Sequence, residues 1–215
     1  NRIRRITDIP TRKPPPVSDD KKSEDTFAGA KTPYYPGFTV MDFPYTDEDG
    51  TKYNLTTAFW YPTLEQPSSY TYDTHSESAE SLVAVDAKLA KSEAPFPIIF
   101  YAHGAYGCGF NGTFFKEYMA SRGYIIAAPD YYDMGPPNFS RQMASCRIKE
   151  GNVVSNLRVL QAARDMKQWE TDKEQSLQYL TKYRYKPTAF LINTVLALTA
   201  AKESRFYRRI DESKI

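Results

Sequence analysis

The residues of this chain with the clearest capacity for chemistry lie together between His103 and Gly109. This segment reads H-G-A-Y-G-C-G and contains one of the chain's two histidines, one of its two cysteines and three glycines. Glycine can adopt backbone conformations that other residues avoid, and it lets a backbone approach a ligand closely. The composition therefore predicts a tightly turned loop that could bind a ligand through its backbone groups.

Two apolar runs and one amphipathic segment surround this loop. Pro97 to Tyr101 and Tyr124 to Ala128 are short, apolar runs, typical of strands that are buried on both faces. Between them, residues 113–122 show apolar side chains at helical spacing, and Gly123 follows where a helix would stop. The apolar side chains of this predicted helix are Phe114, Phe115, Tyr118 and Met119.

The order strand, loop, helix, strand predicts a βαβ unit, in which the two strands lie parallel in one sheet. Ligands of such sheets bind at the carboxyl ends of the strands. The segment from His103 to Gly109 directly follows the first predicted strand. We therefore expect it to lie at the edge of the sheet where chemistry takes place.

Two further strands are predicted nearer the amino terminus, at Phe38 to Phe43 and Tyr53 to Tyr61. The Asp49-Gly50 pair between them is a strong hairpin signal, and Pro62 is expected to end the second strand. The fold class is therefore α/β, with a mixed, mostly parallel sheet, an antiparallel β-hairpin at its start and flanking helices.

The other segments give weaker signals. Residues 64–94 are rich in Ser, Glu and Lys, which favours a long surface loop with at most one helical turn. Helical periodicity is present at Glu150 to Trp169 and at Asp172 to Lys182, and again from Pro187 to Ala201. The closing residues RFYRRIDESKI are typical of the approach to a further strand.

The overall charge says little about partners, because 28 Lys and Arg residues face 26 Asp and Glu residues. Residues 1–34 are polar, Pro-rich and charged, so we expect an extended arm that cannot bury enough apolar surface to order itself. A nucleic-acid-binding arm is the alternative, but the mixed charge disfavours it, and we expect no nucleic-acid partner. No apolar run approaches the roughly 20 residues of a membrane span, and the first residues lack the apolar core of a signal peptide.

The cysteines and the N-glycosylation sequons give information on the cellular compartment of the protein. Cys108 and Cys146 allow one disulfide, and free thiols are the alternative. Three of the seven asparagines begin an N-x-Ser/Thr sequon, namely Asn54, Asn111 and Asn138. This favours a secreted or exported glycoprotein, and a cytoplasmic protein is the alternative.

Four motifs in order resemble one family. The segments FWYPT, FPIIFYAHGAYG and ASRGYIIAAPDYYD are similar to the α/β-hydrolase branch of the platelet-activating-factor acetylhydrolases and dienelactone-hydrolase-like esterases. In that branch a WYP-type motif ends the second strand, an [SA]-H-G loop follows the third, and A-P-D follows the fourth. The closing LALTAAKESRFYRRIDESKI resembles the family's segment before the nucleophile strand. The resemblance covers about residues 37–130 and 187–215.

The resemblance implies the amino-terminal half of a hydrolase, with residues 35–215 as part of one domain. No G-x-S-x-G elbow occurs in the sequence, and in this fold the triad follows the order Ser, Asp or Glu, His. Neither His75 nor His103 matches the family's triad histidine. Nucleophile, acid and base are therefore expected on a second chain or on a carboxyl-terminal segment beyond Ile215, and this other half is the expected obligate partner.

The same resemblance implies that the loop after the third strand supplies half of an oxyanion hole. The donor is then the backbone N–H of Ala105, with Tyr106 as the alternative. Gly104 is expected to permit the turn that aims the donor, and His103 to hold the loop in place. A hydrogen-bonded histidine with a purely structural role is the alternative for His103.

Three aromatic residues are candidates for the wall of an acyl pocket: Tyr106, Phe110 and Tyr131. Ordinary core packing is the alternative for each of them. Asp130 and Asp133 lack a second cluster of ligands, so we expect no metal, and no cofactor is implied.

The function expected from the resemblance is that of a serine ester hydrolase acting on a carboxylic ester or an acetyl phospholipid. A catalytically degenerate hydrolase half that serves as a binding module is the alternative.

Overall fold

The computed structural model describes residues 32–73, 78–104, 108–131 and 172–215. The chain divides into two compact units, Asn1–Lys31 and Thr32–Ile215, and only the second is described. The extended arm predicted for residues 1–34 therefore lies almost wholly outside the described residues. The helix predicted at Glu150 to Trp169 lies outside them as well, as does His75.

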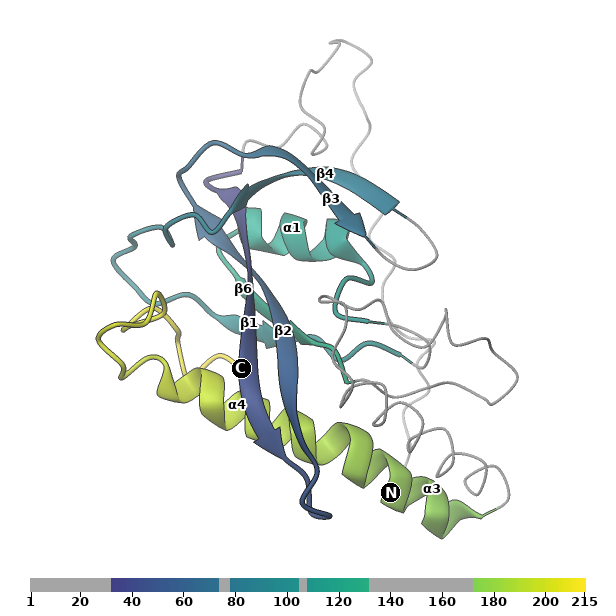
Figure 1. Ribbon diagram of the computed structural model, residues 1–215. Coiled ribbons are helices and arrows are strands. Elements are labelled where there is room, and N and C mark those ends of the chain that lie inside the picture. The colour runs from purple at the N-terminus through teal and green to yellow at the C-terminus, as the bar shows by residue number, and fades with distance from the viewer. Residues whose placement is uncertain (1–31, 74–77, 105–107, 132–171) are drawn as a thin grey trace, which may run out of the picture. The chain divides into compact units, whose positions relative to one another are not determined.

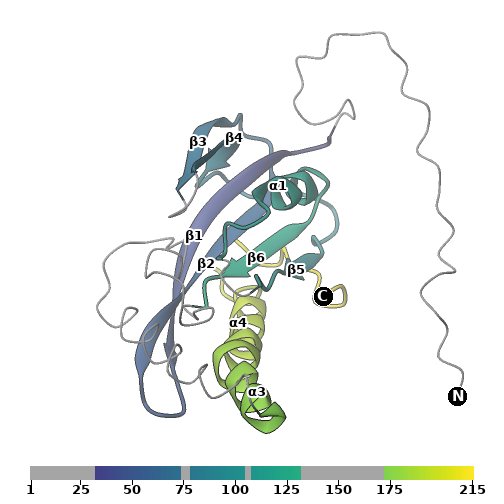
Figure 2. The same cartoon turned by 90° about the vertical axis from the view of Figure 1, so that its right-hand side faces the viewer.

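Six strands form one mixed sheet in the order β3-β4-β1-β2-β6-β5 (Figure 1; Figure 2 labels all of them). The β5–β6 and β1–β4 pairs are parallel, whereas β1–β2, β2–β6 and β3–β4 are antiparallel. The expectation of a mixed sheet with a hairpin at its start is confirmed, but "mostly parallel" is wrong for the described sheet. The strands are β1 (Tyr35–Thr46), β2 (Lys52–Thr63), β3 (Ser68–Asp73), β4 (Ser78–Val85), β5 (Ile98–Phe100) and β6 (Ile125–Pro129).

The hairpin of β1 and β2 turns where Asp49-Gly50 predicts, and Gly50 has a φ of 81°. Both strands are longer than the sequence indicates, and Pro62 does not end β2. Pro62 lies opposite Pro36, and its carbonyl accepts a hydrogen bond from the Ala90 N–H. The backbone of Pro62 thus faces away from β1, so its missing N–H costs no hydrogen bond in this ladder.

The predicted surface loop at residues 64–94 contains a second hairpin, β3 with β4. Tyr72 of β3 and Val83 of β4 are fully buried in one apolar cluster with Phe38 and Trp60. Along β3, the exposed Ser69 and Thr71 alternate with the half-buried Tyr70 and the buried Tyr72. The low overall hydrophobicity of this segment hid a period-two pattern that buries a few large side chains.

The βαβ unit is confirmed. Strands β5 and β6 are parallel neighbours, and helix α1 (Thr113–Ser121) connects them (Figure 2). Gly123 follows the helix with a φ of 93°, and its N–H bonds to the carbonyl of Ala120. This is the left-handed glycine stop that the sequence predicts.

The face that α1 buries is not the aromatic one. The helix exposes Phe114, Phe115 and Tyr118, whereas Met119 is half-buried against the cluster of Phe38 and Trp60. Its buried side chains are Ala120 and the polar Lys116, Glu117 and Ser121. Lys116 donates hydrogen bonds from Nζ to the carbonyls of Gly109 and Asn111. These partners lie on the inner side of the helix, so the lysine is drawn into the core with its hydrogen bonds made.

Glu117 is buried on the same inner face of α1. Its Oε2 accepts a hydrogen bond of 2.7 Å from the Ser81 hydroxyl on β4. Burial raises the pKa of this carboxyl, and the Ser81 and Tyr72 hydrogen bonds and the Lys116 ammonium oppose that rise. A buried hydrogen-bonded network thus joins the helix to the second hairpin.

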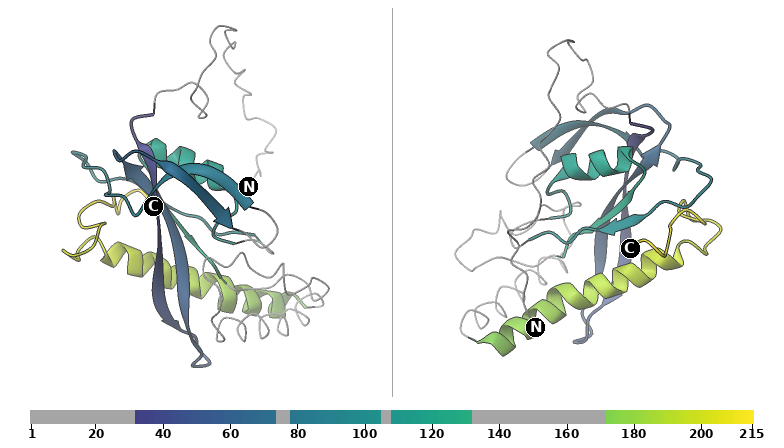
Figure 3. Two further views of the ribbon diagram at one scale, coloured as in Figure 1. Left: turned by 45° about the horizontal axis from the view of Figure 1, so that its top comes forward. Right: turned by 180° about the vertical axis from the view of Figure 1, so that it is seen from behind.

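The carboxyl-terminal third contains one long helical rod made of three segments (Figure 3). Helix α3 (Lys173–Leu180) begins at the side-chain cap of Asp172, a single π-helical turn η3 (Thr181–Tyr185) follows, and α4 (Lys186–Ala197) continues. The sequence predicts separate helices here, and the π turn is what joins them. Pro187 has no N–H and its ring excludes the carbonyl four residues earlier, so a wider turn before it relieves the clash.

The sheet has an apolar cluster on each face. Successive residues of β2 divide between the two, with Phe59 and Tyr61 in the first and Ala58 and Trp60 in the second. The first cluster includes buried side chains of α4, and the second includes Ala120 of α1. No helix of the described part of the chain is long and apolar enough to cross a membrane.

The last residues of the chain lie along the outer edge of β5 (Figure 2). Ile210 forms a parallel bridge with Phe96, and the N–H of Asp211 donates to the carbonyl of Phe96. The N–H of Ile98 donates to the carbonyl of Lys214. The closing segment therefore lies against the edge of β5, and the further strand that its sequence is expected to approach stays a prediction.

Candidate functional site

The candidate site begins where β5 ends, at the loop that starts with His103 and Gly104. Both residues belong to the described part of the chain, whereas Ala105 and Tyr106, the predicted oxyanion donors, lie outside it. The loop follows the carboxyl end of β5, next to the residues that follow the parallel strand β6. This is the edge of the sheet at which the sequence predicts a ligand.

His103 is buried, and both of its ring nitrogens are occupied. Nε2 accepts a hydrogen bond of 3.3 Å from the N–H of Tyr131, and Nδ1 lies 2.9 Å from the carbonyl of Gly104. A nitrogen that accepts carries no proton, so we assign the neutral tautomer in which Nδ1–H donates to Gly104. The imidazole therefore joins the loop after β5 to Tyr131, two residues beyond the end of β6.

The electrostatic surroundings keep this imidazole neutral. Burial, together with the Arg184 guanidinium and the Lys116 ammonium, lowers the pKa of His103 to about 3, against the opposing effect of the Gly104 hydrogen bond. Asp130 Oδ1 lies 3.9 Å from Nε2, the nitrogen that accepts from Tyr131. The pair is therefore a polar contact between a carboxyl group and a neutral ring.

Arg184 is a site residue that the sequence gives no reason to select. Its NH1 donates a 2.6 Å hydrogen bond to the carbonyl of His103, and its NH2 donates a 3.2 Å hydrogen bond to the carbonyl of Gly104. Its guanidinium also lies over the Tyr131 ring, 4.6 Å from the ring centre. The contact spans 80 residues of sequence, and no local motif marks it.

Gly104 itself is exposed, and open space lies where a side-chain Cβ would be. Its φ is outside the left-handed region, unlike that of Gly112 just before α1. The described conformation therefore does not need a glycine at position 104. The φ of Gly104 therefore gives no support to its expected role of permitting the turn.

The candidate pocket residues are not brought together. Phe110 packs with Phe38 and Trp60 in the cluster on one face of the sheet, and Tyr131 belongs to the cluster on the other face. The Tyr131 hydroxyl shares a 2.6 Å hydrogen bond with Thr188 of α4. Both aromatic rings are thus part of the core, and Tyr106 lies outside the described residues.

The turn between the candidate loop and α1 is fastened by Lys116. Besides its two carbonyl partners, its ammonium lies over the ring of Tyr101 at 4.1 Å and over that of Trp60 at 4.9 Å. Burial lowers the pKa of Lys116 to about 7, against the attraction of Glu117. Lys116, which lies against these two rings, therefore holds the backbone carbonyls of Gly109 and Asn111 close to the sheet.

The cysteines and sequons are only partly within the described residues. Cys108 is fully buried and disulfide-bonded, and Cys146 lies outside the described part, as does Asn138. Asn111 is exposed, and its Oδ1 accepts a hydrogen bond from the Cys108 N–H. Asn54 is half-buried on β2. Glycosylation of these asparagines stays a prediction.

No group of three or more His, Cys, Asp or Glu side chains that could hold a metal occurs in the described residues. Asp130 is buried beside His103, and its N–H bonds to the carbonyl of Thr56 on β2. Asp133 lies outside the described residues.

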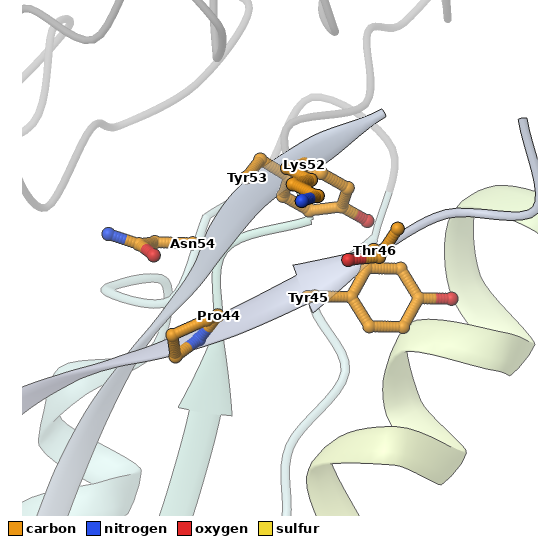
Figure 4. Close-up of a pocket in the computed structure, with 6 residues that line it drawn as sticks. All are labelled: Pro44, Tyr45, Thr46, Lys52, Tyr53 and Asn54. Atoms are coloured by element: carbon orange, nitrogen blue, oxygen red, sulfur yellow. The ribbon is translucent and has the colours of Figure 1, made fainter. Parts of the chain in front are cut away.

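A small pocket of about 230 Å³ lies at the far end of the first hairpin (Figure 4). The rings of Tyr45 and Tyr53 both border it, and Tyr45 also packs against Phe190 of α4. None of the residues around His103 lines it. The pocket is lined by Pro44, Tyr45, Thr46, Lys52, Tyr53 and Asn54.

No family model matches the chain, and no curated protein matches its sequence. Among solved structures, a ferulic acid esterase from Streptomyces cinnamoneus is similar, with a TM-score of 0.46 and 17% sequence identity. The similarity covers 86% of this chain and 51% of the esterase chain, so this chain spans about half the length of that enzyme. The family suggested by the sequence motifs therefore stays a prediction.

Proposed function

We propose that this chain supplies the oxyanion-loop half of a serine ester hydrolase. The nucleophilic serine, the acid and the base then belong to a second chain or to a carboxyl-terminal segment outside the sequence given. The substrate is a carboxylic ester or an acetyl phospholipid, and the protein is exported.

The observation that carries the proposal is that the last residues of the chain lie along the outer edge of β5. Ile210 forms a parallel bridge with Phe96 just before β5, and the carbonyl of Lys214 accepts a hydrogen bond from the N–H of Ile98. A strand that followed the same edge would run parallel to β5, so its carboxyl end would lie beside His103 and Gly104. In the expected fold, the nucleophile strand ends in its serine elbow at this side of the sheet.

The chemistry of ester hydrolysis explains why a nucleophile strand beside β5 would need this loop. Attack of a serine oxygen on the ester carbonyl builds negative charge on the carbonyl oxygen, and fixed backbone N–H donors stabilise it. One donor follows the serine, and the other comes from the loop after the strand that β5 represents. Removing one such donor costs roughly 3–4 kcal/mol of transition-state stabilisation. We assign the second donor to the N–H of Ala105, with Tyr106 as the alternative.

Two preparations test this proposal. Residues 1–215 expressed alone should give no turnover of p-nitrophenyl acetate above buffer and no labelling by a fluorophosphonate, which reacts with activated serines. Protein purified from its natural source should hydrolyse the ester and carry the label on a serine outside residues 1–215.

Turnover or serine labelling by residues 1–215 alone would overturn the proposal. A source preparation in which this chain has a partner but no serine is labelled would favour the alternative, a hydrolase-like binding module. Peptide mapping of the label shows whether a labelled serine lies within residues 1–215 or outside them.

A further inference from the structure

The π turn η3 directs Arg184 at the candidate loop. Single π turns inside α-helices are rare and are found frequently at functional sites. Arg184 lies in this turn and donates to two successive carbonyls, those of His103 and Gly104. Four residues later, Thr188 holds the Tyr131 hydroxyl from the same helical rod. The rod thus fixes both the loop after β5 and Tyr131, two residues beyond the end of β6.

Two carbonyls that are held in place also determine where the N–H groups of their own peptide units point. The C=O and N–H of a trans peptide point in opposite directions in one plane, so a carbonyl held in place also directs the N–H of its own peptide. The peptide with the His103 carbonyl carries the Gly104 N–H. The peptide with the Gly104 carbonyl carries the next N–H along the chain, which is the donor assigned above to Ala105.

We propose that Arg184 is a positioning residue for the oxyanion loop, acting through the carbonyls of His103 and Gly104. This inference rests on the proposed function. Arg184 does not touch the reacting atoms in this proposal. It holds the backbone that carries the donor, so that little reorganisation is needed when charge develops on the substrate.

The chemistry of the guanidinium suits this task better than that of an ammonium. Its planar fork presents several N–H donors in fixed directions, so one group can hold two neighbouring carbonyls at once. The same planar group lies over the Tyr131 ring, which the Thr188 hydrogen bond holds in place. A lysine at position 184 would supply a compact charge without the fork.

A matched control lies on the same turn. Lys182 also belongs to η3 and carries a positive charge, but its Nζ pairs with Asp49 at the tip of the first hairpin, 3.2 Å away. Replacing either residue by Met removes one positive charge from the same helical turn. Only the Arg184 change removes the hydrogen bonds to the candidate loop.

The test compares Arg184→Met, Arg184→Lys and Lys182→Met in the complete hydrolase, with p-nitrophenyl acetate as substrate. We expect Arg184→Met to lower kcat by about 10- to 100-fold while KM stays within about twofold, as for a mispositioned group that acts mainly in the transition state. Arg184→Lys should recover only part of that loss, and Lys182→Met should keep the wild-type kcat. Added methylguanidinium should raise the kcat of an Arg184→Ala variant but not that of Lys182→Met.

A second measurement needs no activity. In residues 1–215, hydrogen exchange of the Gly104 amide should become faster in Arg184→Met than in Lys182→Met. Equal exchange in the two variants, or an equal kcat in the complete enzyme, would overturn the positioning role. If the wild-type complex itself has no esterase activity, the proposed function fails, and the exchange measurement alone decides the role of Arg184.

Discussion

His103 joins two strand ends as an uncharged ring. Its Nε2 accepts from the Tyr131 N–H, and its Nδ1–H donates to Gly104. Protonation of Nε2 would place a proton against the Tyr131 N–H and a charge beside the Arg184 guanidinium. The contact is therefore compatible with neutral histidine only.

This geometry predicts a pH dependence of stability. The pKa of His103 is about 3 in the folded chain and near its ordinary value of 6.5 when unfolded. Between these values the unfolded state binds more protons, so the free energy of unfolding falls as the pH falls through that window. The greatest slope from this group is about 1.4 kcal/mol per pH unit.

Urea unfolding of the wild type and His103→Gln at pH 7.5, 6, 5 and 4 measures this effect. Gln keeps hydrogen-bonding capacity and cannot titrate, so its stability deficit should shrink as the pH falls below about 6.5. A constant difference across the series would contradict the assignment of a neutral, buried histidine.

Helix α1 shows that the spacing of apolar residues can indicate a helix and still give the wrong face. Its bounds agree with the sequence prediction to within a residue, and its glycine stop is as predicted. The inner face is set instead by partners distant in sequence, such as Ser81 for Glu117. Buried polar groups are favourable only when they are paired, and the spacing of apolar residues contains no information on such distant partners. That spacing alone therefore predicts that the aromatic face is buried.

The exposed aromatic face of α1 gives a prediction with its own control. Phe114 is 76% exposed, so Phe114→Ser should change the free energy of unfolding by no more than about 0.5 kcal/mol. Ala120 is fully buried against the sheet, and Ala120→Leu should destabilise by about 1–3 kcal/mol through overpacking. Thermal or urea unfolding measures both, and the opposite ranking would mean that α1 packs through its aromatic residues.

Elements with local signals are predicted well from the sequence, and those that depend on distant partners are not. Asp49-Gly50 locates the first hairpin, and the apolar runs around α1 locate the βαβ unit. The sequence does not indicate the β3–β4 hairpin, because the whole segment 64–94 is rich in Ser, Glu and Lys. Of the candidate site, the sequence locates His103 and its loop, but it gives no indication of Arg184, whose contact depends on the packing of the whole domain.

For the molecule as a whole, the last residues of the chain are part of the sheet. Ile210 is buried in the first core cluster and bridges to Phe96, whereas Ile215 is 61% exposed. The segment between them continues the pairing along β5 through the carbonyl of Lys214. The outer edge of β5 is therefore covered by residues more than a hundred positions later in the sequence.

Two alanine substitutions separate these roles. Ile210→Ala should lower the free energy of unfolding by about 2–5 kcal/mol, because a buried side chain is removed and a cavity is left. Ile215→Ala should change it by less than about 0.5 kcal/mol. Similar, small effects of the two changes in urea unfolding would show that the closing segment adds nothing to the core.

The reach of Arg184 across the domain also has a consequence for synthesis. A ribosome completes β5, α1 and β6 before it reaches Arg184, which follows Gly104 by 80 residues. The nascent domain can therefore form its βαβ unit while the carbonyls of His103 and Gly104 still lack the guanidinium. The loop can form its hydrogen bonds to Arg184 only after the helical rod has been synthesised and has docked.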